Sequence, residues 1–216
     1  LAAAPPAPSQ EGGPPVLRRS FAEVATPAPP FPEGAKGPKF EPRPGETIAW
    51  IGGTEVCDLD RHGFLEAGIH LAWPGLGLRW RNLAWQGDTV HRQARPLYYY
   101  TKEGDPQPGS IPDHRERTEP GIVFIAFGKM ESLEGPERLP DFVAAYAKLL
   151  EDLLPLTKRI VLVEPTPFFR SGPAANLASE RNAVLSAYVE AIERLAAERN
   201  LLFLRSAAEW NAGMSN

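Results

Sequence analysis

The stretch Ile122-Val123-Phe124-Ile125-Ala126-Phe127 is apolar at every position, and Gly128-Lys129-Met130-Glu131 follows it at once. A run of this length without polar residues is typical of a central strand in a parallel sheet, because helices then cover both faces. Four further runs have the composition of short strands: Thr47–Ile51, Leu78–Leu83, Ile160–Val163 and Leu201–Leu204. Among these, the second alternates apolar with polar side chains, which predicts an edge strand with one face in water.

Segments with apolar residues at helical spacing separate these runs. They cover Phe64–Ala72, Phe142–Leu154 and Val184–Ala196, and Ser179 is a candidate N-cap for the last of them. Strands that alternate with helices in this way are joined by crossover connections. The sequence therefore predicts an α/β fold with a doubly wound, mostly parallel five-stranded sheet and helices on both faces. Such sheets bind ligands at the loops that follow the carboxyl ends of their strands.

The composition limits the kind of protein. The chain has 216 residues, of which 43% are hydrophobic, and its formal net charge of −4 gives no basic surface for nucleic acid. No stretch reaches the roughly 18 to 20 apolar residues that a membrane-spanning helix needs. Cys57 is the only cysteine, which excludes an intramolecular disulfide and a cysteine-based metal site. With neither a dinucleotide-binding motif nor a P-loop in the sequence, we expect no cofactor and no metal.

Residues 1–38 differ in composition from the rest of the chain, since they contain ten prolines and few large apolar residues. Such a segment buries too little apolar surface to offset the entropy of ordering. The sequence therefore predicts a disordered or extended linker over residues 1–38 and one folded domain over residues 39–216. An arm of this kind suggests export to the periplasm or the exterior of a bacterium, with a cytoplasmic protein as the alternative. A complete signal peptide is absent from the sequence as given.

Three of the strand-end segments resemble those of a known family. The segments are Ile48–Thr54, Arg81–Thr89 and Phe124–Glu131, and Asn82–Thr89 is the most specific part. In order and spacing they are similar to the first three sequence blocks of the SGNH/GDSL hydrolases. The resemblance implies a flavodoxin-like three-layer α/β/α fold and an esterase or deacetylase that acts on acylated carbohydrates or lipids. Members use a serine nucleophile, a glycine and an asparagine as oxyanion donors, and an Asp-x-x-His pair near the C-terminus.

Carried over residue by residue, the resemblance places Thr54 at the nucleophile and Gly53 at the aspartate before it. Gly87 matches the glycine whose backbone N–H points to the developing oxyanion. Gly128 is also matched, but Met130 stands where the family has asparagine, and a thioether cannot donate a hydrogen bond. The residues alone favour a helix cap over a nucleophile at Thr54, although a threonine hydroxyl activated by a base can attack.

The remaining residues of this third block leave alternatives open. Glu131 is either a ligand contact or a cap for its own loop. Lys129 has the character of a solvated surface lysine, although it could supply positive charge near the site.

The general base is missing from the matched segments. All four histidines precede the run Ile122–Phe127, and no Asp-x-x-His pair follows Leu204. His91 is the best-placed substitute, because it lies shortly after Gly87 in the same loop. Either the chain is a piece of a longer protein whose base lies beyond Asn216, or the site has degenerated.

Two hypotheses of function follow. In the first, the chain is an SGNH/GDSL-type ester hydrolase with Thr54, Gly87 and His91 as catalytic groups, and with weak or no activity because of the unmatched positions. In the second, it is a non-catalytic module that binds a glycan or a partner protein in the same cleft. The expected partner is a small-molecule ester, an acylated carbohydrate or a protein, and the sequence leaves the oligomeric state open. The residues expected to bind it are Gly53, Trp85, Gly128, Met130 and Glu131, with Phe168 and Phe169 at the rim.

Overall fold

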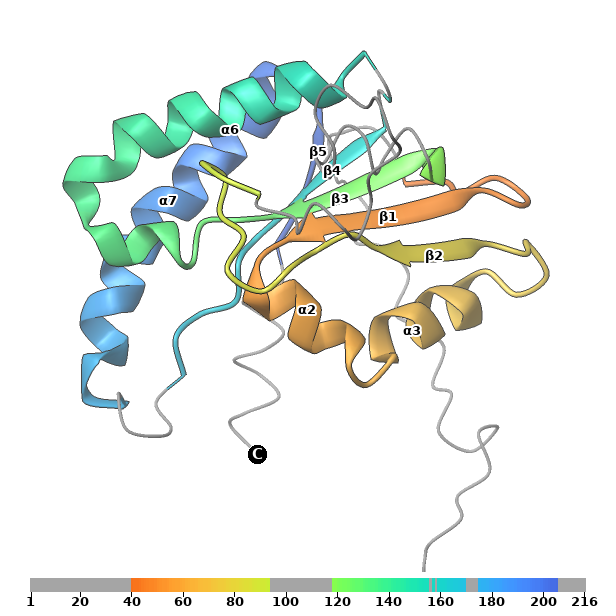
Figure 1. Ribbon diagram of the computed structural model, residues 1–216, viewed down its shortest axis with the longest axis horizontal. Coiled ribbons are helices and arrows are strands. Elements are labelled where there is room, and N and C mark those ends of the chain that lie inside the picture. Colours follow the sequence, from red (N-terminus) through yellow and green to blue (C-terminus); the bar gives the residue numbers. More distant parts are fainter. Residues whose placement is uncertain (1–39, 94–117, 156, 158, 170–174, 206–216) are drawn as a thin grey trace, which may run out of the picture. The chain divides into compact units, whose positions relative to one another are not determined.

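The computed structural model describes residues 40–93, 118–155, 157, 159–169 and 175–205 (Figure 1). The expected linker over residues 1–38 lies outside the described residues. Within them, one sheet contains β1 (Thr47–Gly52), β2 (Arg79–Asn82), β3 (Ile122–Ala126), β4 (Ile160–Val163) and β5 (Leu202–Leu204). The strand order is β2-β1-β3-β4-β5, and every pairing is parallel. The sheet confirms the predicted doubly wound α/β architecture.

Side chains of the central strands alternate between two apolar cores, one on each face of the sheet. In β1, Ile48 and Trp50 belong to one core, whereas Ala49 and Ile51 belong to the other. Every residue of β3 and β4 is buried, as expected for strands covered on both faces. This is why the central strands appear in the sequence as continuous apolar runs.

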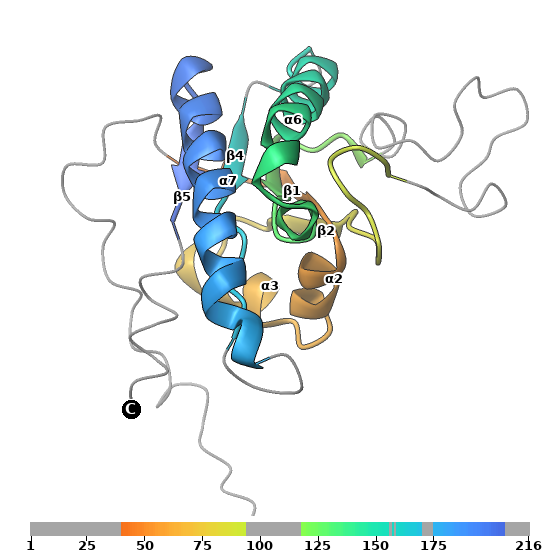
Figure 2. The ribbon, with the colours of Figure 1, turned by 90° about the vertical axis from the view of Figure 1, so that its left-hand side faces the viewer.

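In the part of the chain that the structure describes, two helices cover each face of the sheet. The helices α2 (Thr54–Asp60) and α3 (Phe64–Ala72) lie on one side of the sheet, and α6 (Leu139–Leu153) and α7 (Ala178–Glu198) lie on the other (Figures 1 and 2). Asn200 ends α7 in the left-handed conformation, with φ of 51°, and the N–H of Leu201 returns to the carbonyl of Ala196. None of the helices that the structure describes is long and apolar enough to cross a membrane.

Two local predictions were wrong in their bounds. The helix α7 begins at Ala178 after a 3₁₀ turn over Ala175–Leu177, so Ser179 lies in its first turn and is not the N-cap. The edge strand β2 covers only Arg79–Asn82, because the side-chain oxygen of Asn82 accepts a hydrogen bond from the N–H of Ala84 and turns the chain there. Both differences arise from local turns at the ends of the elements, which periodicity does not encode.

Candidate functional site

The carboxyl ends of β1, β2 and β3 meet where the strand order reverses, which is where open α/β sheets bind ligands. Two glycines at the end of β1 permit the close approach of these segments. A Cβ atom on Gly52 would lie 2.4 Å from the side chain of Val56, and one on Gly53 would lie 2.6 Å from the carbonyl oxygen of Asp88. Only glycine therefore fits at these two positions without a shift of the surrounding chain.

Thr54 and Gly87 come together at this point. The backbone N–H of Gly87 donates a hydrogen bond to Oγ1 of Thr54 at 3.2 Å, although 33 positions separate them in sequence. The N-cap of α2 is Gly53, and it makes no side-chain capping bond. The Thr54 hydroxyl thus faces the loop after β2, and the turn at Gly87 needs its φ of 81°, which glycine adopts readily.

His91 follows in the same loop, but its side chain is exposed. The preceding residue, Val90, is buried, and the backbone N–H of Val90 donates a hydrogen bond to the carboxylate of Glu131. Among the residues that the structure describes, no hydrogen bond joins His91 to Thr54. The structure therefore brings together two of the three residues expected to be catalytic, and among the residues it describes the third has no contact with Thr54 that would make it a base.

Glu131 is 3% exposed and holds two loops together. One carboxylate oxygen accepts the N–H of Val90 at 2.6 Å, and the other accepts the N–H of Gly128 at 2.8 Å. Of the two roles that the sequence left open, this geometry is that of a loop cap. Met130 lies beside it at the surface and is 48% exposed.

A polar cluster of Glu55, Lys129 and Thr166 joins the ends of β1, β3 and β4, and the sequence did not suggest it. Lys129 Nζ donates to Thr166 Oγ1 at 2.8 Å, and Thr166 Oγ1 donates to Glu55 Oε2 at 2.8 Å. The ammonium of Lys129 is also 3.6 Å from Glu55 Oε2. The side chain of Lys129 is only 19% exposed, so the prediction of a solvated surface lysine was wrong.

Aromatic rings and burial set the electrostatics of this cluster. The ammonium of Lys129 lies 5.3 Å from the ring centroid of Phe168 and 5.6 Å from that of Phe169. Burial raises the pKa of Glu55 above its ordinary value, and the neighbouring Lys129 opposes that shift. The sequence could have indicated this cluster only through the positions of Glu55 and Lys129, because each follows the end of a buried strand by three residues.

The rim residue Phe168 is fixed by α7. Its N–H donates to Oδ1 of Asn182 at 2.8 Å, and Nδ2 of Asn182 donates back to its carbonyl at 2.9 Å. This pair of bonds holds the loop after β4 over Lys129. In the part of the chain that the structure describes, no group of three His, Cys, Asp or Glu side chains could hold a metal ion.

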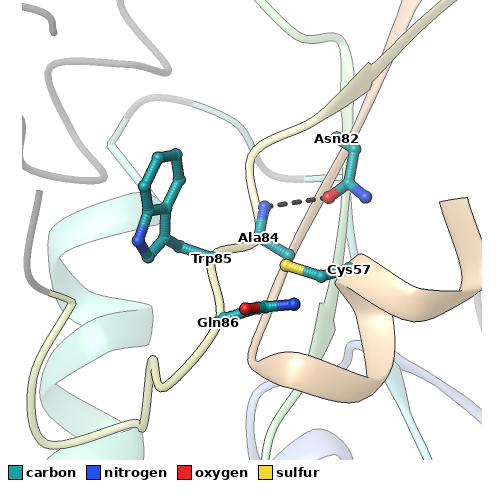
Figure 3. A pocket seen from close by; sticks show the side chains of 5 residues that line it. All are labelled: Cys57, Asn82, Ala84, Trp85 and Gln86. Carbon is teal, nitrogen blue, oxygen red and sulfur yellow. Dashed lines mark hydrogen bonds between the residues drawn. The ribbon is translucent and has the colours of Figure 1, made fainter. Parts of the chain in front are cut away.

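An open pocket of about 440 Å³ lies on the β2 side of the site (Figure 3). Cys57 of α2 forms one wall, and the end of β2 with its following loop forms the other. Asn82 is fixed there, because its Nδ2 donates to the carbonyl of Val56 at 3.3 Å and its Oδ1 accepts the N–H of Ala84 at 2.9 Å. Trp85, which the sequence predicts to bind substrate, lines this pocket together with Gln86.

Comparison with known proteins finds solved structures of similar fold. No family model matches the sequence, and no curated protein matches it. A catalytic mutant of Axe2, an acetylxylan esterase from Geobacillus stearothermophilus, has a TM-score of 0.57 and 20% identity over 82% of this chain and 83% of that chain. LAE5, an alpha/beta hydrolase enzyme from the metagenome of Lake Arreo in Spain, has a TM-score of 0.54 and 16% identity over 81% of this chain and 83% of that chain.

The catalytic mutants of Axe2 that share this fold replace a serine, an aspartate or a histidine of that enzyme by alanine. At sequence identities this low, the similarity between these enzymes and the chain is one of fold alone. The chain thus has the α/β fold of the SGNH-type hydrolases, as the resemblance of its three strand-end segments implies.

Proposed function

We propose that this chain is an SGNH/GDSL-type hydrolase-like protein whose cleft binds a carboxylic ester or an acylated carbohydrate, and that Thr54 supports slow ester hydrolysis there. The observation that carries the proposal is the 3.2 Å contact between the Gly87 N–H and the Thr54 hydroxyl. A backbone donor beside a nucleophilic oxygen is the arrangement that acyl transfer needs, because the attacked carbonyl oxygen becomes an anion next to the nucleophile. When an ester binds, its carbonyl oxygen takes the Gly87 N–H in place of Thr54.

Three features explain why the activity is slow. The methyl group of Thr54 crowds the attack, Met130 offers no second oxyanion donor, and no described histidine contacts the hydroxyl. Loss of one oxyanion donor costs about 10²- to 10³-fold in rate. Loss of a positioned general base costs about 10²- to 10⁴-fold.

The hydrolysis of p-nitrophenyl acetate by the full chain tests the proposal. We expect Thr54→Ser to hydrolyse the ester faster than the natural chain, because a primary hydroxyl attacks with less crowding, and Thr54→Ala to fall to the buffer rate. Thr89→Ala is the matched control, since Thr89 lies in the same loop as Gly87 and, among the described residues, its hydroxyl accepts only the N–H of Arg92. Equal rates for the natural chain, Thr54→Ser, Thr54→Ala and buffer would eliminate hydrolysis by Thr54.

The alternative function is non-catalytic binding of a glycan in the same cleft, and the pocket beside Trp85 favours it. An indole ring with neighbouring amide groups can pack on a sugar ring and bond its hydroxyls. Titration calorimetry of the Thr54→Ala variant with an acetylated xylooligosaccharide tests this function apart from hydrolysis. Binding that Trp85→Ala abolishes supports it, and the absence of heat at millimolar ligand rejects it.

A further inference from the structure

The polar cluster of Glu55, Lys129 and Thr166 also has the arrangement of an activated nucleophile. The Thr166 hydroxyl donates a hydrogen bond to Glu55 Oε2 at 2.8 Å, a separation at which a base can take a proton from the group that it activates. Lys129 contacts both partners and fixes them relative to each other, since its Nζ is 2.8 Å from Thr166 Oγ1 and 3.6 Å from Glu55 Oε2. The hydrolysis proposed for Thr54 uses none of these contacts.

The surroundings of Glu55 suit a general base. Burial raises the pKa of its carboxyl group above the ordinary value, although Lys129 opposes the shift, so the ionised carboxylate is a stronger base than an exposed one. Its side chain is nevertheless 18% exposed, so a substrate can reach it. A threonine oxygen has two lone pairs, and among the described residues only Lys129 donates to Oγ1 of Thr166. The second lone pair remains for attack on a carbonyl carbon.

A cavity of about 300 Å³ adjoins the cluster, and both Glu55 and Thr166 form part of its wall. Apart from Glu164, the other residues of the wall are apolar or aromatic and belong to the sheet and to the helices α2 and α3, Leu65 among them. Cavities of roughly 300 Å³ and larger are those in which proteins hold small ligands. The hydroxyl and its base therefore border a space that suits the apolar acyl chain of an ester.

We propose that Thr166 is a second nucleophile of this chain, activated by Glu55, and that it hydrolyses esters whose apolar acyl chain occupies this cavity. The site lies at the same edge of the sheet as Thr54, because Thr54 and Glu55 are consecutive residues, but it needs neither the Thr54 hydroxyl nor Gly87. The ammonium of Lys129 lies beside the attacking oxygen and supplies positive charge next to the oxyanion that forms there.

The reaction takes two steps and needs only water as a co-reactant. In the first step, Thr166 Oγ1 bonds to the carbonyl carbon and its proton passes to Glu55. The bond from that carbon to the leaving oxygen then breaks, and the alcohol departs with the proton. In the second step, water gives a proton to Glu55 while its oxygen bonds to the acyl carbon. The bond to Oγ1 then breaks, Oγ1 takes the proton back, and the carboxylic acid leaves.

Hydrolysis of two p-nitrophenyl esters by the Thr54→Ala variant of the full chain tests the proposal apart from Thr54. The hexanoate has four methylene groups more than the acetate, and burial of each is worth about fourfold in binding. We therefore expect kcat/KM to be about 10²-fold higher for the hexanoate than for the acetate. In this variant, adding Thr166→Val should return the hexanoate reaction to the buffer rate, and adding Glu55→Gln should slow it about 10²-fold or more. Adding Thr166→Ser should preserve it, because the hydroxyl remains.

Thr157→Val is the matched control for the loss of a threonine hydroxyl. Thr157 is also half-buried and its hydroxyl donates to the carbonyl of Gly121, but it precedes β4, whereas Thr166 follows that strand. Leu65→Phe fills the cavity from α3 and should slow the hexanoate reaction about tenfold or more. Leu71→Phe, on the same helix, is its control, because Leu71 is exposed and does not line the cavity. Circular dichroism confirms that each variant is folded.

Three results would overturn the proposal. One is hydrolysis of the hexanoate at the buffer rate by Thr54→Ala. The second is a rate that Thr166→Val leaves unchanged or lowers no more than Thr157→Val does. The third is an equal rate for Leu65→Phe and Leu71→Phe. Failure of hydrolysis by Thr54 is a separate result, because it is measured with the acetate, by comparing the natural chain with its variants at position 54.

Discussion

At the scale of single residues, Gly53 shows a position that packing reserves for glycine. Its φ of −92° is open to any residue, so the restriction is steric and comes from the Asp88 carbonyl 2.6 Å from the missing Cβ. We predict that Gly53→Ala lowers the free energy of unfolding by about 1 to 3 kcal/mol, as overpacking does elsewhere. Urea denaturation of the natural chain and of Gly53→Ala measures this difference in the free energy of unfolding.

The control for Gly53→Ala is Gly68→Ala. Gly68 lies inside α3, where a Cβ meets no atom within 4 Å, and alanine there favours the helix by about 0.5 to 1 kcal/mol. If Gly53→Ala were as stable as Gly68→Ala, the loop after β2 would be free to move away and the steric account would fail. The same contact predicts that an aspartate at position 53, as the family resemblance would place it, harms the fold.

Met130 is the residue whose replacement should restore catalytic chemistry. If the cleft hydrolyses esters through Thr54, Met130→Asn adds a donor at the position where the family resemblance expects one. We predict a rise of about tenfold or more in the hydrolysis of p-nitrophenyl acetate, because one such donor is worth up to about 10²- to 10³-fold. The rise should vanish when Thr54→Ala is added.

Leu133→Asn is the matched control for this gain. Leu133 lies in the 3₁₀ turn that follows Met130 and is 45% exposed, close to the 48% of Met130. Equal rates for the two variants would show that a polar side chain in this region acts without reaching the oxyanion.

At the scale of elements, the sequence predicted the strands better than the loops. Strands β3 and β4 were evident because burial on both faces leaves only apolar residues in them. The burial of Lys129 was not evident, because it results from the meeting of loops that follow three different strands. The family resemblance assigned Thr54 and Gly87 to one site, whereas the length of β2 depends on one side-chain bond of Asn82.

The loops after β2 and β3 are both held by the side chain of Glu131. Both of its carboxylate oxygens accept backbone N–H groups, and an amide in its place offers one acceptor and turns an NH₂ group toward a donor. We predict that Glu131→Gln lowers the free energy of unfolding by about 1.5 to 3 kcal/mol. In the same variant, hydrogen exchange of the backbone amides of Val90 and Gly128 should become faster.

Glu134→Gln is the control for that loop clamp. Glu134 belongs to the same 3₁₀ turn, but it is exposed, and within the described part of the chain its one ion pair is with Arg138 at the surface, which is worth little. A Glu131→Gln variant with the stability and exchange rates of Glu134→Gln would show that the two loops hold their positions without the carboxylate.

At the scale of the whole molecule, the cluster of Glu55, Lys129 and Thr166 ties the first turn of α2 to the loops after β3 and β4. It lies at the same edge as the contact of Thr54 with Gly87, so the stability of the fold and the geometry of the candidate site depend on neighbouring segments of the chain. A change in the charge of Glu55 should therefore be measurable in the unfolding of the molecule as a whole.

Burial raises the pKa of Glu55 above its ordinary value of 4.5, although Lys129 opposes the shift. The folded state then holds a proton on Glu55 more tightly than the unfolded state does. Its contribution to stability is fully present below the unfolded pKa and is lost as the pH rises through the folded pKa. We predict that the natural chain gains stability relative to Glu55→Gln as the pH falls from about 7 to about 5.

Urea denaturation of both chains across that range measures the difference, and Glu151→Gln serves as the control because Glu151 lies exposed on α6. The difference in unfolding free energy between the natural chain and Glu151→Gln should stay flat, whereas the difference from Glu55→Gln should grow toward acid pH. Parallel curves for the natural chain and Glu55→Gln would mean that the attraction of Lys129 cancels the cost of burial. Glu55 would then be ionised equally in both states, and the cluster would act as a plain ion pair that links three strand ends.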